Sequence, residues 1–251
     1  MKPFLTADWK TNIGTGDYMF KKRTLDGKVN FVVRILFVLA FLETVVFAVF
    51  TNDYSNIINA FTALLGFALT FVPEAVENIS KRRLRFSSGV KIAIVLFIFA
   101  AELLGEINSF YEKISWWDNM LHSLSGAILA LIGFMLVYAM NESEKVEIHL
   151  SPLFIAAFAF FFAVAAGAVW EIFEFAGDRL FSMNMQKFRP PEGVNVLNTD
   201  AWRYDAGLID TMTDIILDTV TAFAVAVLGF IKIKTGKWRS ENYKKKEDSG
   251  K

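Results

Sequence analysis

The chain has 251 residues, of which 54% are hydrophobic and 21% are charged, and 26 of them are phenylalanine. Soluble proteins average about 45–50% apolar and about 25% charged residues, whereas here the apolar residues form long runs with most of the charges between them. That pattern is typical of a protein that crosses a membrane several times, and it excludes intrinsic disorder and a coiled coil. The absence of cysteine excludes disulfides and thiol chemistry. Because 26 basic residues balance 26 acidic ones, the net charge predicts no nucleic-acid partner.

Six apolar runs have the length of a membrane-spanning helix, since about 20 helical residues cross ~30 Å of hydrocarbon. The predicted fold class is therefore all-α, a polytopic membrane helix bundle of about six transmembrane helices in one domain, 31–231. A segment, 1–30, precedes this domain, and a basic tail, 232–251, follows it. The predicted spans are 31–50, 53–72, 90–110, 117–140, 152–177 and 208–231. The second span is the least apolar, because Asn56, Asn59 and Thr62 dilute it.

The distribution of positive charge predicts the orientation. With these spans, 20 lysine and arginine residues fall on the side of the two termini and 5 on the opposite side. Lysine and arginine are retained in cytoplasmic connections. Both termini are therefore expected in the cytoplasm of a bacterial or archaeal cell, with the protein in the cell membrane.

Acidic residues and one histidine gather where three of the predicted spans reach the outer side. Asp118 and His122 are four residues apart near the start of the fourth span, so they share one helical face. Glu171 and Glu174 share a face near the end of the fifth, and Asp210 and Asp214 share one at the start of the sixth. Four further carboxylates extend this layer, those of Asp178, Asp218, Glu102 and Glu106. Glu43, past the middle of the first span, has no partner that the sequence reveals.

So many carboxylates cannot all stay ionised in a shared apolar space. A divalent metal ion of undetermined identity would neutralise them, and helix bundles build such sites from acids and histidine at i, i+3 and i+4. Two alternatives remain open: a proton or cation pathway, and a structural polar network around a water-filled vestibule. The predicted metal ligands are Asp118, His122, Glu171, Glu174, Asp210 and Asp214.

Three motifs also carry a resemblance. A [YW]DxxxHxxxG element reads Trp117, Asp118, His122 and Gly126, an ExxE element reads Glu171 and Glu174, and a DxxxD element reads Asp210 and Asp214. In this order and spacing they resemble the YjdF-like family of uncharacterised bacterial inner-membrane proteins, over about half of the chain. The resemblance implies an inner-membrane protein and adds weight to these residues, but it implies no reaction. Asp178 and Asp218 lie outside the pattern.

Two classes of function fit these features. The first is a metal-dependent intramembrane hydrolase or transferase acting on a lipid or lipid-linked substrate, with Glu174 as general base. Arg179, Arg189 and Arg203 would then meet a phosphate headgroup. The second is a cation- or proton-coupled transporter, although no inverted repeat or polar path through the cytoplasmic halves is visible. The sequence contains no nucleotide-binding loop, GxSxG or HExxH element, so membrane lipid is the expected partner and a nucleotide is not.

Overall fold

The computed structural model describes residues 24–51, 54–81, 84–141, 150–181, 183–186 and 206–235, and every regular element in these ranges is a helix. The all-α class is therefore confirmed. The first 23 residues, the stretch 187–205 with Arg189 and Arg203, and the tail from 236 lie outside the described residues.

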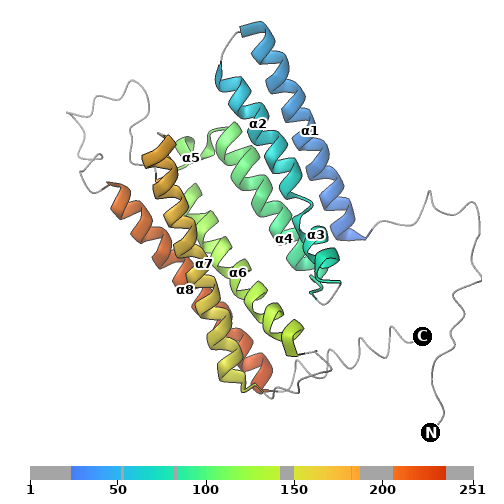
Figure 1. The fold of residues 1–251 in the computed structure, drawn as a ribbon, viewed down its shortest axis with the longest axis vertical. Coiled ribbons are helices and arrows are strands. Elements are labelled where there is room, and N and C mark those ends of the chain that lie inside the picture. The colour runs from blue at the N-terminus through green and yellow to red at the C-terminus, as the bar shows by residue number, and fades with distance from the viewer. Residues whose placement is uncertain are drawn as a thin grey trace, which may run out of the picture.

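The helices follow the predicted spans (Figure 1), except that the second span is divided by a bend and the third ends in a π-helix. Their bounds are α1 Leu25–Thr51, α2 Tyr54–Leu69, α3 Val72–Ile79, α4 Ser88–Ile98, η1 Phe99–Ile107, α5 Phe110–Lys113, α6 Trp117–Asn141, α7 Pro152–Phe181 and α8 Ala206–Lys234. By length and apolar composition α1, α6, α7 and α8 can each cross a membrane, and α2 with α3 forms a fifth candidate if the bent pair counts as one span. The predicted third span is divided between α4 and η1, so a count of six stays a prediction.

The sequence predicts one continuous span over 53–72, whereas in the structure two helices joined at a bend take its place. α2 stops at Leu69 and α3 continues at an angle of 41°. Pro73 in the first turn of α3 explains the break, because proline has no N–H to continue the helical bonds and fits at a helix start. Arg34 of α1 braces the bend: its guanidinium donates to the Thr70 carbonyl and to Glu74 Oε1, both at 3.0 Å.

The last part of the predicted third span is a π-helix, η1, which hydropathy does not predict. Each turn of a π-helix holds an extra residue, and such turns are frequent at functional sites. The Asn108 side-chain amide donates to the Leu103 carbonyl at 2.6 Å and closes the end of η1. Ser109 then adopts a left-handed conformation with φ 57°, and the chain turns into the short α5.

Small residues bring α6, α7 and α8 into close contact. Ala130, Ala163 and Ala222, one from each helix, form a buried cluster at the centre of this three-helix group. A Cβ on Gly133 of α6 would lie 2.8 Å from the Cα of Ala159 in α7, so only glycine allows that approach. The other helices form a second group around Val33, Phe37, Val95 and Ile98, and α4 and η1 contact α6 (Figure 1). The three-helix group is the part that positions the acidic residues.

Candidate functional site

The acidic residues and His122 lie at one end of the three-helix group. α6 and α8 begin at this end and α7 ends there, so residues early in α6 and α8 lie level with residues late in α7 (Figure 1). This antiparallel order is why motifs about 50 residues apart in the sequence meet in space. The contacts described below cross between all three helices.

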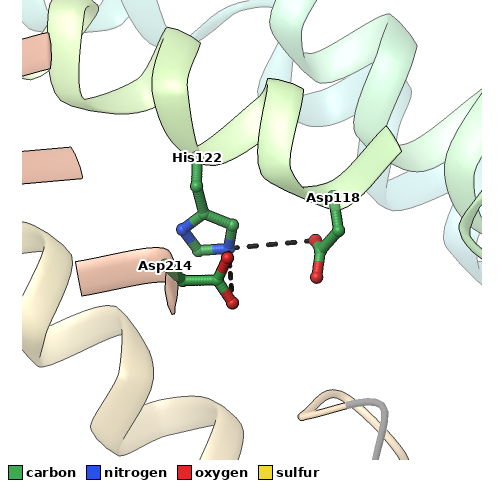
Figure 2. A group of neighbouring side chains, drawn as sticks. All are labelled: Asp118, His122 and Asp214. Carbon is green, nitrogen blue, oxygen red and sulfur yellow. Dashed lines mark ion pairs between the residues drawn. The ribbon is translucent and has the colours of Figure 1, made fainter. Parts of the chain in front are cut away.

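His122 is the centre of the site. Its side chain is buried, and Nε2 lies 3.8 Å from Asp118 Oδ1 and 3.8 Å from Asp214 Oδ2 (Figure 2). The other ring nitrogen, Nδ1, lies 3.8 Å from Glu171 Oε1 and 3.5 Å from Asp218 Oδ2. One imidazole is thus surrounded by four carboxylates from α6, α7 and α8. The three faces that the residue spacing defines therefore meet. That any of these groups binds a metal stays a prediction.

Several of these carboxylate oxygens are buried without a hydrogen bond. Glu171 is 3% exposed and Asp214 is 1% exposed. Within the part of the chain that the structure describes, both oxygens of Glu171 and Oδ2 of Asp214 lack a hydrogen-bond partner. Leaving such a group unsatisfied costs ~1–3 kcal/mol, and more when it is charged. The Thr211 hydroxyl also acts on the Glu171 carboxyl, and a proton, a water or a cation would complete the environment of these oxygens.

One nitrogen of His122 and one carboxylate oxygen each from Asp118 and Asp214 all lie within 4.8 Å of one another. Ligands bonded at ~2.0–2.6 Å to a common ion are separated by only a few ångströms, so these three need small movements to share one. Figure 2 shows that both carboxylates face the same ring nitrogen of His122, Nε2. An imidazole with carboxylate oxygens suits manganese, iron and zinc, whereas magnesium and calcium prefer oxygen ligands alone.

Asp218 belongs to the site more closely than the sequence motifs indicate. It is 2% exposed, and besides His122 it contacts Ser125, whose hydroxyl donates to Asp218 Oδ1 at 2.6 Å. Gly167 of α7 makes room for this carboxylate, because a Cβ there would lie 2.6 Å from Asp218 Oδ2. The signal was present in the sequence: Asp218 follows Asp214 by four residues and shares its face.

Glu174 and Asp210 are not among the four carboxylates that surround His122. Glu174 is buried one turn beyond Glu171 on α7, and Trp170 holds it with an indole N–H that donates to Glu174 Oε1 at 2.8 Å. Asp210 is half-buried and lies one turn before Asp214, at the start of α8. Both residues therefore lie at the rim of the His122 cluster, on the side of the helix ends.

Asp178 has partners of its own. Its two oxygens accept the backbone N–H groups of Met185 at 2.7 Å and Gln186 at 3.0 Å. The Gln186 side chain in turn donates to Thr211 Oγ1 of α8 at 2.8 Å. Asp178 thus fixes the chain that leaves α7 against the start of α8, which is a structural role. We therefore leave it out of the proposed ligand set.

Glu102 and Glu106 lie on η1, outside the three-helix group. Tyr111 of α5 interacts electrostatically with both of them and with Asp118 and Glu174 of the three-helix group. Burial raises the pKa of the Tyr111 phenol, and the carboxylates of Asp118 and Glu106 raise it further. The phenol therefore stays protonated and able to donate a hydrogen bond. Its ring packs on Gly105 of η1, where a Cβ would overlap it. No motif in the sequence indicates Tyr111.

Comparisons with known proteins agree with a membrane protein. Residues 32–235 match the model of a family described as "Predicted membrane protein (DUF2238)". A Thermotoga maritima protein described as "Uncharacterized protein" is 27% identical over 198 residues, which cover 78% of this chain and 88% of that protein. No solved structure gives a significant match. Neither match carries the YjdF name, so that finer assignment stays a prediction. The family match spans most of the chain, including all three acidic motifs, and the chain therefore belongs to the DUF2238 family of membrane proteins.

Proposed function

We propose that the His122 cluster binds a divalent metal ion and forms the centre of an intramembrane hydrolase or transferase. The observation that carries this proposal is a buried imidazole between four carboxylates, with three of their buried oxygens lacking a hydrogen-bond partner among the described residues. The proposed ligands are His122, Asp118 and Asp214, with Glu171 and Asp218 close enough to join them. A cation would neutralise the carboxylates and occupy the unsatisfied oxygens together.

A bound divalent ion would supply an electrophile and an activated water in such a site. Glu174 is suited to act as the general base, because it is buried beside the cluster and the Trp170 indole fixes one of its oxygens. That bond leaves the second oxygen, Oε2, available to accept a proton. The surrounding helices are long and apolar enough to cross a bilayer, which supports a lipid or lipid-linked molecule as the proposed substrate. The exposed Arg179 at the end of α7 is then positioned for an anionic headgroup.

A cation- or proton-coupled transporter would use the same acids but needs a polar route onward. Beyond the site, the described core of the three-helix group contains Ala130, Ala163 and Ala222, followed by a cluster built on Phe134, Val137, Ile155 and Ala159. These side chains are apolar and closely packed. This packing favours a site that acts at one end of the bundle. The transporter is kept as the alternative that the experiments below can identify.

Elemental analysis of detergent-purified protein tests the metal site. Wild type, His122→Ala and the control Glu43→Gln, which removes a carboxylate far from the cluster, are purified without chelator. We expect a stoichiometric divalent metal in wild type and in Glu43→Gln, and its loss in His122→Ala. Absence of metal from wild type, after incubation with manganese, iron and zinc salts, would falsify the proposal and leave a proton or structural network.

The catalytic step is tested separately from metal binding. Glu174→Gln keeps the shape of the side chain and its acceptor for Trp170, so we expect it to retain metal. Mass spectrometry of a bilayer lipid extract incubated with wild type should detect a new product that the variant does not form. Equal product formation by the variant would remove Glu174 from the mechanism. Metal binding without any lipid turnover would favour the transporter.

A further inference from the structure

A second polar site lies on the other side of η1 from the acidic cluster. A groove of about 410 Å³ runs between α1, α2 and η1, and we call it the α1–α2–η1 groove. Its polar lining comes from Glu43, Thr44, Asn56, Asn59 and Asn108. None of these residues contacts the His122 cluster, so this groove is independent of the proposed metal site.

The polar side chains of the groove lie toward one end, beside the apolar Phe47 and Ile107, and the other end is apolar. Asn56 lies near the start of α2 and Asn108 just past the end of η1, which places both at the same end of the bundle. Leu36 and Phe99 line the deeper part, and Leu36 lies seven residues before Glu43 on α1, about 10 Å along the helix axis. A phospholipid has the same division between a polar headgroup and an apolar chain.

Among the described residues that line the groove, Glu43 is the one with an ionisable side chain. Its side chain is exposed to the groove, and among the described residues it forms no hydrogen bond or ion pair. An acidic side chain within a spanning helix is costly and usually has a partner. A positively charged ligand in the groove would supply that partner.

The side-chain amides of Asn56 and Asn108 also leave oxygens that can accept a hydrogen bond from a ligand. The Asn56 amide nitrogen donates to Thr51 Oγ1 at 3.1 Å, and the Asn108 nitrogen donates to the Leu103 carbonyl at 2.6 Å. Each amide nitrogen thus uses one of its two N–H groups within the protein, and among the described residues neither amide oxygen accepts a bond. The Thr44 hydroxyl is also used, since it donates to the Ala40 carbonyl at 2.9 Å. Besides the amide N–H groups that remain, the groove therefore offers a ligand free amide oxygens and the two carboxylate oxygens of Glu43 as acceptors.

We infer that the α1–α2–η1 groove binds a phospholipid whose headgroup carries a primary ammonium, with Glu43 as its counter-charge. A primary ammonium has a positive charge and three N–H donors, and it matches a carboxylate with two amide oxygens. A trimethylammonium headgroup has the charge but no donor, and a glycerol headgroup has donors but no positive charge. The lipid chain lies along Leu36, Leu39 and Phe99.

Native mass spectrometry tests this directly. The full chain is offered an equimolar mixture of phosphatidylethanolamine, phosphatidylcholine and phosphatidylglycerol with identical acyl chains, and the lipids retained after release from detergent are identified. Wild type should prefer phosphatidylethanolamine by about tenfold, the scale of one charge-assisted contact. Glu43→Gln should bring the three lipids close to parity. The control Glu112→Gln, an exposed carboxylate on α5, should keep the preference.

Other outcomes overturn the inference. A wild type without preference, or a preference that survives Glu43→Gln, removes Glu43 as the headgroup partner. If Glu43→Gln instead converts a dimer to a monomer at unchanged lipid preference, the groove is an interface between copies of this chain. Melting curves with each lipid give a second measurement: only phosphatidylethanolamine should raise the melting temperature of wild type, and it should not do so for Glu43→Gln.

Discussion

His122 is held by contacts that also fix its neighbours, and Asp218 is the clearest case. Ser125 bonds one oxygen of Asp218 while the other faces His122 Nδ1. Gly167 leaves the space in which this carboxylate lies. An acid that is oriented by a hydroxyl, and that itself faces an imidazole, is the arrangement by which proteins orient metal-ligating histidines.

Loss of the Ser125 hydroxyl is therefore expected to weaken metal binding without removing a ligand. In Ser125→Ala, Asp218 Oδ1 loses its 2.6 Å donor and the carboxylate no longer fixes the imidazole. Outer-shell changes of this kind cost ~10–100-fold in metal affinity. Titration of metal-free protein measures the effect. Ser123→Ala is the matched control, since that hydroxyl donates to the Asn119 carbonyl within α6, and its affinity should equal that of wild type.

Chelation is expected to destabilise the wild-type protein. A ligand that binds only the folded state stabilises it by ~2.7 kcal/mol at a hundredfold excess over Kd, and removing a cation also leaves buried carboxylates to repel one another. Asp214→Asn reduces that repulsion, and among the described residues no donor bonds Asp214 Oδ2 that the amide would displace. The variant should therefore melt at the same temperature with and without EDTA.

Melting curves of both proteins are compared after elemental analysis has shown that EDTA has removed the metal. A wild type that loses its metal but keeps its melting temperature would contradict this prediction. A proton network would give a third pattern, in which stability changes with pH and EDTA has no effect.

At the scale of the helices, glycine decides how closely the site can assemble. A Cβ on Gly126 of α6 would lie 2.5 Å from both the Asp218 carbonyl oxygen and Thr221 Oγ1 of α8. The backbone of α8 cannot yield to a methyl group there without moving away from α6. Because Asp214 and Asp218 are carried by the same part of α8, such a movement separates them from His122.

Gly126→Ala should accordingly damage both stability and the site. Overpacking of this kind costs ~1–3 kcal/mol, and we expect a lower melting temperature together with reduced metal content. Gly89→Ala is the control, because the nearest atom to a Cβ there is Ser87 Oγ at 4.0 Å. Alanine at position 89 should leave the metal content unchanged and should not lower the melting temperature, since alanine favours a helix more than glycine does. A Gly126→Ala protein with normal stability and metal content would show that α6 and α8 are not held at this distance.

The sequence predicts these elements unevenly, for physical reasons. Charged residues bound the apolar runs sharply, so the predicted span 117–140 differs from α6 by one residue at its end. Hydropathy measures how well a segment dissolves in lipid, and it contains no information on the hydrogen-bond pattern of the backbone. It therefore predicts neither the π-helix η1 nor the bend before Pro73. Hydropathy also does not predict the role of Arg34, because its partners Thr70 and Glu74 lie 36 and 40 residues away in the sequence.

For the candidate site too, the sequence predicts some features and leaves others open. Spacing of three and four residues places the acids of each helix on one face, and topology brings the faces to one end of the bundle. Spacing alone cannot tell which acid approaches His122. That choice depends on where α6, α7 and α8 touch, which Gly126 and Gly167 determine. The role of Asp178 depends on two backbone N–H groups in the chain after α7, and no side-chain pattern reports those.

For the molecule as a whole, the orientation in the membrane decides which compartment the acidic site faces. The charge distribution predicts that both termini are cytoplasmic, which places the site on the outer side. Natural cysteines are absent, so single cysteines can be introduced without a background signal. Ser115 lies between α5 and α6 at the site end and is exposed, and Asn78 is exposed on α3 near the other end.

We expect Ser115→Cys to react with a membrane-impermeant thiol reagent in intact cells and Asn78→Cys to react only after the cells are opened. Each variant should react fully in detergent, which controls for accessibility. The reversed pattern would place the His122 cluster on the cytoplasmic side. The substrate would then be a lipid of the inner leaflet, and the groove around Glu43, whose polar end lies at the same end of the bundle, would face that leaflet too. The labelling result therefore fixes the leaflet for both proposed sites at once, because α1, α6 and α8 are parts of one helical bundle.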